Sequence, residues 1–256
     1  MKNTIFDLSG RVALVTGGSQ GLGKAMARAF ATAGADVVIS SRSEGKLQEA
    51  TVEIAEGTDA KVEYVVADMT DRQHVKRLAD VAVDRLGKVD ILVNNAGNNV
   101  PRPIDTVDDE TWDNLLELNL TSCMALTRYL VPGMKDRRWG RVIFISSVMG
   151  VGSAAERVPY STTKAALLGL ARACAMDLGP FGITANCIAP GPFATDLPMS
   201  LLSEEAREKF AGRTALGRWG QPDELAGPAL LLASDAGSYI TGTMLLVDGG
   251  TMSKIF

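Results

Sequence analysis

The sequence predicts an α/β fold, with a doubly wound sheet of seven parallel strands and helices on both of its faces. Seven short apolar or β-branched runs alternate with longer segments whose apolar residues recur at helical spacing. A strand followed by a helix, repeated along a chain, indicates parallel strands whose crossover helices cover both faces. Because no linker-like tract or internal repeat interrupts the 256 residues, we expect a single domain over residues 1–256.

The expected elements follow one another regularly, apart from one stretch in the last third of the chain. We expect strands at 12–16, 36–40, 62–67, 90–93, 142–145, 184–188 and 244–247. We expect helices at 23–32, 46–56, 72–86, 110–135, 161–178, 204–211 and 222–233. The irregular stretch, 190–203, has three prolines and the exposed-looking side chains Phe193, Leu197, Met199, Leu201 and Leu202. An apolar loop after a strand is typical of a lid, so we expect a substrate lid at 190–215.

The composition is that of a folded protein without a nucleic-acid or membrane partner. Apolar residues make up 46% of the chain and charged residues 22%, and the net charge is −4. An acidic balance gives no electrostatic footprint for nucleic acid or for an anionic membrane surface. The N-terminus lacks the apolar core of a signal peptide, and no apolar run is long enough to span a bilayer. We therefore expect a cytoplasmic protein.

The cysteines and the single histidine do not suggest a metal site. Cys123, Cys174 and Cys187 are widely spaced, form no C-x-x-C pair and are odd in number. We interpret them as reduced, packed thiols. His74 lies in a polar run before an expected helix, so we expect it at the surface. No metal is expected.

A glycine-rich turn lies between the first expected strand and the first expected helix. It reads TGGSQGLG over residues 16–23. Glycines let the backbone approach a pyrophosphate closely, and the helix N-terminus offers unpaired N–H groups and the positive end of its dipole. A tight turn that needs positive φ would also explain the glycines. We interpret the turn as a phosphate-binding loop.

Several motifs occur together in an order and spacing that one family shares. They are T-G-x-x-x-G-x-G at 16–23, NNAG at 94–97, the serine pair at 146–147, Tyr160-x-x-x-Lys164, Pro190-Gly191 and VDGG at 247–250. On these motifs the chain resembles the short-chain dehydrogenase/reductase family over essentially its whole length. The resemblance implies a single-domain Rossmann fold that binds a nicotinamide dinucleotide.

The resemblance also implies where the dinucleotide is contacted. Asp68 matches the residue that binds the adenine amino group, although a helix N-cap would also explain it. Asn94, Ala96 and Gly97 match the turn that lines the adenosine ribose, and Thr195 matches a hydroxyl on the nicotinamide side. The full implied set is Gly17, Ser19, Gly21, Leu22, Gly23, Ser41, Arg42, Asp68, Met69, Asn94, Ala96, Gly97, Tyr160, Lys164, Pro190, Gly191 and Thr195.

The end of the second expected strand bears on which dinucleotide is preferred. Ser41 and Arg42 stand where an acidic residue would bind a ribose 2′-hydroxyl and repel a 2′-phosphate. A hydroxyl beside a guanidinium suits a phosphate, since arginine forms charge-assisted bonds to its oxygens. The alternative is a solvated surface arginine. Family members often carry a second basic residue just before Gly21, where this chain has Gln20. We expect NADP(H) to be preferred, with NAD(H) as the alternative cofactor.

Four residues form the implied catalytic set. Tyr160 and Lys164 share one helix face, and an adjacent ammonium favours the phenolate that acid/base chemistry needs. Ser147 follows the fifth expected strand, and the family spacing selects it over Ser146. Asn119 is a polar residue inside an apolar helix, which is costly to bury unless it is hydrogen-bonded. It matches the family asparagine that holds a water in the proton relay.

The chemistry implied by the resemblance is direct hydride transfer between nicotinamide C4 and a carbonyl or carbinol carbon. Ser147 would polarise the substrate oxygen, Tyr160 would give or take its proton, and Lys164 would anchor the nicotinamide ribose. A nonenzymatic dinucleotide sensor usually lacks this set of residues. Enoyl reductases space the tyrosine and the lysine more widely.

Two substrate classes remain open at this point: a small polar ketone or sugar acid, as in gluconate 5-dehydrogenase-like members, and the acyl chain of 3-oxoacyl-carrier-protein reductases. Arg138 offers one docking charge for an acidic carrier, but Phe181 stands where carrier-dependent enzymes often have another. The segment RTALGRWGQPDEL at 213–225 resembles the sugar-acid members. We favour the small-molecule substrate, for which polar groups near the expected pocket mouth are Asn98, Asn99, Arg102, Glu156 and Arg157.

The expected helix at 161–178 is apolar nearly all round. One face of such a helix covers the sheet, and the other needs a second partner. We therefore expect a homo-oligomer, either a dimer or a tetramer.

Overall fold

The predicted parallel sheet is present in the computed structural model, which describes residues 4–195, 199–200 and 202–253. All six strand pairings are parallel, and the spatial order is β3-β2-β1-β4-β5-β6-β7. The order reverses between β1 and β4, and open parallel sheets bind ligands beyond the carboxyl ends of the strands at such a point. The strands are β1 Val12–Thr16, β2 Asp36–Ser41, β3 Val62–Val66, β4 Ile91–Asn94, β5 Gly140–Ile145, β6 Ile183–Pro190 and β7 Met244–Val247.

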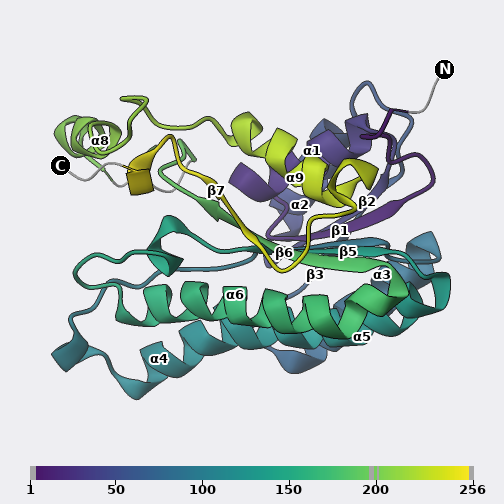
Figure 1. Cartoon of the computed structure of the whole chain (residues 1–256), viewed down its shortest axis with the longest axis horizontal. Helices are drawn as coiled ribbons and strands as arrows, with labels where there is room; N and C mark the ends of the chain where they lie inside the picture. Colours follow the sequence, from purple (N-terminus) through teal and green to yellow (C-terminus); the bar gives the residue numbers. More distant parts are fainter. Residues whose placement is uncertain (1–3, 196–198, 201, 254–256) are drawn as a thin grey trace.

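Helices cover both faces of the sheet (Figure 1). One layer contains α1, α2 and α9, and the other contains α3, α5 and α6. The bounds are α1 Gly21–Thr32, α2 Glu44–Ala55, α3 Arg72–Leu86, α4 Asp109–Leu116, α5 Ser122–Arg137, α6 Val158–Leu178, α8 Glu204–Ala211 and α9 Ala226–Ala233. None of the helices in the described part of the chain has both the length and the apolarity that a membrane crossing requires.

The two layers bury two separate hydrophobic clusters. Val37 and Ile39 of β2 belong to the cluster under α1, α2 and α9, whereas Val38 belongs to the cluster under α3, α5 and α6. Successive strand residues point to opposite faces, so a strand covered on both sides is apolar throughout. This is why the strands are recognised in the sequence as continuous apolar runs rather than alternating ones.

The expected helix at 110–135 is interrupted. Its first part is α4, residues Glu117–Thr121 form a π-helical turn, and α5 follows. A π turn lets one residue leave the regular helical register, and such turns occur often at functional sites. Here the turn contains the buried Asn119, whose side chain bonds outside the helix. Helical periodicity alone did not predict this interruption.

The side chains of the stretch after β6 are more buried than expected. Phe193 is buried, not exposed, because its ring packs against Gly220 in an isolated parallel bridge. Met199 and Leu202 are half-buried, while Leu197 and Leu201 lie outside the described residues. The expected helix at 204–211 is present. The helix expected at 222–233 begins with a 3₁₀ turn at Pro222–Leu225, and only Ala226–Ala233 is α-helical.

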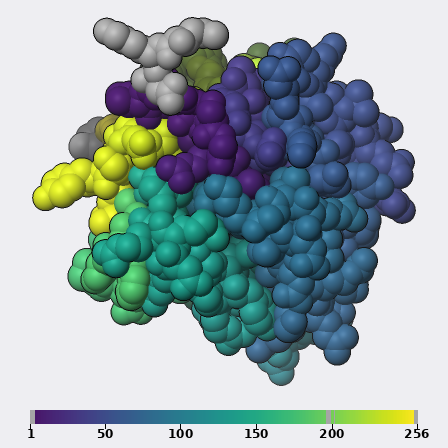
Figure 2. All heavy atoms as spheres, turned by 90° about the vertical axis from the view of Figure 1, so that its right-hand side faces the viewer, coloured from purple at the N-terminus to yellow at the C-terminus, as the bar shows by residue number. Residues whose placement is uncertain are grey.

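A buried carboxylate ties the sheet together at its amino-terminal edge, which Figure 2 views with the purple N-terminal residues against the yellow part of the chain. Asp90 lies just before β4, and its fully buried carboxylate accepts from Val12 N at 3.1 Å. It also pairs with Lys88 Nζ at 2.8 Å and with Arg137 Nε at 3.0 Å. One side chain thereby joins β1, β4 and α5.

We expect Asp90→Asn to lower the free energy of unfolding by about 1.5–3 kcal/mol, because a buried charged hydrogen bond is lost while the shape is kept. Chemical denaturation followed by circular dichroism would measure the change. Asp80→Asn is the matched control, since the side chains of Asp80 and its partner Lys76 are 56% and 59% exposed, and surface pairs contribute below about 1 kcal/mol. Equal effects of the two variants would contradict the assignment.

Candidate active site

The glycine turn between β1 and α1 requires glycine at three of its positions. Gly17 and Gly21 have φ of 65° and 55°, values that favour glycine. A Cβ at Gly23 would lie 2.3 Å from the Gly17 carbonyl oxygen, so this position also requires glycine. The first turn of α1 contains no acidic residue, and its N-cap, Gln20, makes no side-chain capping bond. The unpaired N–H groups of this turn fit the acceptor oxygens of a pyrophosphate.

Four hydrogen bonds hold this turn to the end of β4. Thr16 Oγ1 accepts from Asn95 N at 2.9 Å and from Ala96 N at 3.0 Å. Asn95 Nδ2 donates to the carbonyls of Thr16 at 2.8 Å and Gly17 at 3.2 Å. The carboxyl ends of β1 and β4 are thus fixed relative to each other where the strand order reverses. Asn95 was not among the predicted site residues, although it lies inside the NNAG motif.

Lys164 is a buried cation at the end of β5. Only 4% of the residue is exposed, and its Nζ donates to the Ile145 carbonyl at 2.8 Å. In return, Ser146 Oγ donates to the Lys164 carbonyl at 2.7 Å. This reciprocal pair fixes the start of α6 against β5. One hydrogen of the ammonium is used here, which leaves two for a ligand.

The structure distinguishes the two serines that compete for the catalytic position. The hydroxyl of Ser146 is committed to the Lys164 carbonyl. The Ser147 hydroxyl accepts from Met149 N at 3.1 Å, and no bond that it donates is present among the described residues. Ser147 can therefore still donate to a substrate oxygen, as the family spacing predicts.

Asn119 holds the loop after β4 through both of its amide atoms. Its Oδ1 accepts from Asn98 N and its Nδ2 donates to the Asn98 carbonyl, each at 2.9 Å. Nδ2 also donates to Thr163 Oγ1 at 3.2 Å, and Thr163 Oγ1 donates to the Tyr160 carbonyl at 2.9 Å. These bonds satisfy the buried amide and connect it to the backbone that carries Tyr160. Because both amide hydrogens are used, a water held by this side chain would have to donate to Oδ1.

Gly97 brings these groups to one place. A Cβ at Gly97 would lie 3.1 Å from Asn119 Oδ1 and 3.2 Å from Lys164 Nζ. Lys164 Nζ lies 5.7 Å from the centre of the Tyr160 ring, and Tyr160 is half-buried. Asn119 and Lys164 therefore meet at Gly97 after β4, Tyr160 lies beside Lys164, and Ser147 follows the neighbouring strand β5.

The residues expected at the adenosine end lie at the ends of β2 and β3. Ser41 ends β2, and the exposed Arg42 follows it. Asp68 accepts from Thr70 N at 2.9 Å and from Thr70 Oγ1 at 2.8 Å. Partial burial opposes ionisation of Asp68, but the Thr70 bonds and the nearby Arg42 guanidinium outweigh it and lower its pKa. The N-cap of α3 is Asp71, so the capping role considered for Asp68 is excluded.

Two predicted contacts have side chains directed into the core. Met69 is 5% exposed and belongs to the cluster under α3 and α5. Asn94 is 2% exposed, and its Nδ2 donates to Thr127 Oγ1 of α5 at 3.3 Å. Only the backbone of these two residues faces the sheet edge. Thr195 stands against the glycine turn, 3.2 Å from the position of a Cβ on Gly21.

The loop that follows β6 is closed at its base. Ala194 N donates to the Gly220 carbonyl at 2.8 Å, and Gly220 N donates to the Pro192 carbonyl at 3.0 Å. The closed segment thus ends at Gly220, five residues beyond the end expected for the lid. Above the base, Trp219 packs on Phe210 of α8, with ring centroids 5.6 Å apart.

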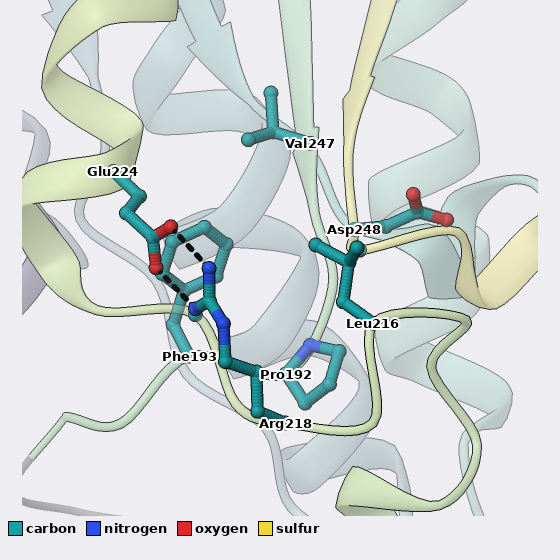
Figure 3. A pocket seen from close by; sticks show the side chains of 9 residues that line it. Pro192, Phe193, Leu216, Arg218, Glu224, Val247 and Asp248 are labelled. Atoms are coloured by element: carbon teal, nitrogen blue, oxygen red, sulfur yellow. Dashed lines mark hydrogen bonds and ion pairs between the residues drawn. The ribbon is translucent and has the colours of Figure 1, made fainter.

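A cavity of about 180 Å³ lies beside this base, between the ends of β6 and β7 (Figure 3). The Arg218 guanidinium faces both carboxylate oxygens of Glu224 at 2.7 Å each. These bonds lower the pKa of Glu224 to about 2, so the pair stays ionised at ordinary pH. The cavity is lined by Pro192, Phe193, Leu216, Arg218, Gly220, Glu224, Val247, Asp248 and Gly249, and none of the four predicted catalytic residues contributes to it.

Two arginines meet near Tyr160. Residues Arg102 and Arg157 form an isolated parallel bridge, and Arg102 N donates to the Glu156 carbonyl at 3.1 Å. Glu156 adopts φ of 62°, which a non-glycine residue rarely does. The bridge therefore joins the backbone of the loop after β4 to that of the loop before α6. Each guanidinium donates to a neighbouring carbonyl, Arg102 to Pro101 at 3.0 Å and Arg157 to Glu156 at 3.2 Å.

The cysteines and His74 are not among the predicted catalytic or dinucleotide-binding residues. Burial raises the pKa of the Cys123 thiol and raises that of Cys187 to about 12, so both remain protonated. The three cysteines are free thiols, and Cys174 is half-buried. His74 is half-buried rather than fully at the surface, and its Nδ1 accepts from Asp68 N at 3.3 Å. The described residues contain no group of three or more His, Cys, Asp or Glu placed to hold a metal ion.

The fold and this site together define an oxidoreductase that uses a nicotinamide dinucleotide. A family model described as Enoyl-(Acyl carrier protein) reductase matches residues 17–252. The chain belongs to the short-chain dehydrogenase/reductase family, whose members act on CH–OH and C=O groups.

Known relatives fall into both substrate classes. The chain is 37% identical to a 3-oxoacyl-[acyl-carrier-protein] reductase of Thermotoga maritima, over 95% of this chain and 98% of the relative. It is 36% identical to gluconate 5-dehydrogenase of Gluconobacter oxydans, over 96% of each chain. A crystal structure of gluconate 5-dehydrogenase from Burkholderia cenocepacia, in complex with NADP and tartrate, matches all of both chains with a TM-score of 0.92 and 36% identity.

Proposed function

We propose that the protein is an NADP(H)-dependent oxidoreductase that interconverts a small polar ketone, such as a keto sugar acid, and its secondary alcohol. The observation that carries this proposal is that Lys164 and Asn119 meet at Gly97 with Tyr160 beside Lys164, while Ser147, at the end of β5, keeps a free donor. The glycine turn between β1 and α1, whose N–H groups suit a pyrophosphate, supports the same proposal.

Each of the four side chains has a separate task in the proposed mechanism. The bound dinucleotide supplies or accepts the hydride at nicotinamide C4. Ser147 donates its hydroxyl hydrogen to the substrate oxygen, and Tyr160 gives that oxygen a proton during reduction or removes one during oxidation. Lys164 uses its two remaining hydrogens to hold ribose hydroxyls. Asn119 positions the loop of Asn98 and accepts from a relay water.

The spacing of the acid/base pair favours carbonyl chemistry over reduction of a C=C bond. Tyr160 and Lys164 are separated by one helical turn in α6, so both reach the same atom. The four predicted catalytic residues also argue against a nonenzymatic dinucleotide sensor, because a sensor needs neither a free serine donor nor a buried ammonium beside the tyrosine.

The remaining dinucleotide contacts are proposed at the positions expected from the sequence, with Met69 and Asn94 contributing their backbones.

NADP(H) is proposed as the preferred dinucleotide because the end of β2 carries no acid. Arg42 is exposed there and pairs with no carboxylate at ion-pair distance among the described residues. A guanidinium of this kind can bind a 2′-phosphate with charge-assisted bonds. The solved relative from Burkholderia cenocepacia holds NADP.

The substrate class is proposed from the arginines of the two segments whose backbones meet just before Tyr160. Arg102 and Arg157 would attract a carboxylate carried by the substrate, and a keto sugar acid has one. The same solved relative holds tartrate, a hydroxy acid. The whole chain, residues 1–256, is proposed to act as one domain with a substrate lid at 190–215, and the hydrogen bonds of Gly220 to Pro192 and Ala194 support a fixed base for it.

Reduction of a carrier-bound 3-oxoacyl chain is the second candidate, which the identity to the Thermotoga maritima enzyme favours. Phe181 stands where carrier-dependent enzymes often have a cation that binds the acidic carrier. Lys135 would supply a positive charge there, since its Nζ lies 4.5 Å from the centre of the Phe181 ring. However, Arg138 precedes β5 while Ser147 follows it, so these cations lie at the opposite edge of the sheet from the site of the same chain. This separation, about 20 Å for a strand of this length, makes the carrier the weaker proposal.

The predicted homo-oligomer stays a prediction. The outer face of α6 exposes Ala165, Gly169, Ala173 and Met176, the last of them 74% exposed. A second copy packed on this face would cover the apolar surface that α6 leaves uncovered.

Tyr160→Phe should lower kcat by about 100-fold or more while NADPH binding stays within a few-fold, because only the proton-transfer oxygen is removed. Steady-state kinetics with a keto sugar acid and fluorescence titration of NADPH would measure the two effects. Tyr239→Phe, at a fully exposed ring, is the control. Wild-type turnover in Tyr160→Phe would refute the acid/base assignment.

Arg42→Ala should shift the ratio of NADPH to NADH affinity toward NADH by about 10- to 150-fold, the equivalent of one charged hydrogen bond of about 1.5–3 kcal/mol. Titration of each dinucleotide with parent and variant would give the ratio. The proposal of NADP(H) preference fails if the parent prefers NADH or if both affinities fall equally.

Arg102→Gln should lower kcat/KM for 5-ketogluconate about tenfold, as expected for one charge-assisted bond at a solvated rim. A neutral ketose serves as the control substrate, and its kcat/KM should stay unchanged. If the parent reduced an acetoacetyl thioester far more efficiently than keto sugar acids, the order of the two candidate functions would be reversed.

A further inference from the structure

Lys46 and Gln20 come from different elements of the dinucleotide-binding half and meet at one hydrogen bond. Lys46 is in the first turn of α2, and Gln20 is the N-cap of α1. Lys46 Nζ donates to Gln20 Oε1 at 2.9 Å. The lysine ammonium therefore stands beside the glycine turn, although 26 residues separate the two positions.

The bond fixes which atoms of Gln20 remain free. An ammonium has only donors, so it contacts the amide oxygen and leaves the Gln20 amino group to donate elsewhere. Gln20 makes no capping bond to α1. Together with two hydrogens of Lys46 and the Arg42 guanidinium, this corner presents donors from three segments. The Ser41 hydroxyl donates to the Ser43 carbonyl at 3.4 Å. A phosphate monoester has acceptor oxygens and two negative charges, which suits such a set.

The acidic side chains of the same corner are engaged with other partners. Glu44 Oε1, on the first turn of α2, accepts from Tyr64 Oη at 3.2 Å. Glu53 pairs with Lys24 at 2.6 Å. The Asp68 carboxylate accepts two bonds from Thr70. Glu53 is thus neutralised by Lys24, whereas Glu44 and Asp68 keep their negative charges, and Arg42 and Lys46 are the cations nearest to the ends of β2 and the glycine turn.

We infer that Lys46, positioned by Gln20, is a second specificity-determining residue for the 2′-phosphate of the dinucleotide. It supplies from α2 the positive charge that other family members place just before Gly21. Arg42 and Lys46 would contact the phosphate from the β2 side and from the glycine-turn side, respectively. The inference rests on the proposed preference for NADP(H).

The test compares ligands that differ only in the 2′-phosphate, namely 2′,5′-ADP and 5′-AMP, by calorimetric titration. Lys46→Met should weaken 2′,5′-ADP binding about fivefold, as for one exposed charge pair, and leave 5′-AMP binding unchanged. Gln20→Arg added to Lys46→Met should restore the lost affinity, because it places a cation directly on the glycine turn. Lys61→Met is the control, since it removes one exposed charge just before β3.

The outcomes separate this inference from the proposal on which it rests. If the parent bound 2′,5′-ADP no better than 5′-AMP, the proposed NADP(H) preference would fail. If the parent bound 2′,5′-ADP better, but Lys46→Met behaved as Lys61→Met does, the role of Lys46 alone would be refuted. Thermal unfolding of each variant should match the parent, because Lys46 and Lys61 are exposed.

Discussion

The hydroxyl of Thr16 is the contact on which the arrangement of the site depends. The neighbouring strands β1 and β4 lead to crossovers in opposite directions, so their carboxyl ends diverge and leave a crevice. Thr16 Oγ1 accepts from two successive N–H groups after β4, and Asn95 returns two bonds to the carbonyls that open the glycine turn. The two halves of the crevice are thereby held at one spacing before any ligand enters.

The second half of the site is organised by a π-helical turn, which costs regular helical hydrogen bonds. That cost is offset because the released residue, Asn119, bonds the backbone of Asn98 at both its N–H and its carbonyl. The same amide reaches Thr163 and, through it, the backbone of Tyr160. Loop, helix and acid/base residue thus share one buried network, in which each member depends on the others.

Periodicity predicted the strands and the order of elements, because each depends on residues close in sequence, while the four catalytic positions stay a prediction from motif spacing. The family spacing already selected Ser147 over Ser146, and the bond from Ser146 to Lys164, which joins β5 to α6, adds a physical reason. The core-directed side chains of Met69 and Asn94 and the contact between Lys46 and Gln20 were not predicted. The direction of the Met69 and Asn94 side chains depends on which side of the strand end other elements cover, and the Lys46–Gln20 contact depends on how α1 and α2 pack. Patterns among residues close in sequence carry no information on such tertiary contacts.

The tie between Phe193 and Gly220 has a consequence for how this scaffold can change. The two ends of the segment 194–219 are hydrogen-bonded to each other, and the entropy of closing a flexible loop changes only slowly with its length. Insertions or deletions between the ends are therefore expected to cost little closure entropy. A segment from a relative with the same base could be transplanted here as a unit, provided that Thr195 beside the glycine turn is kept.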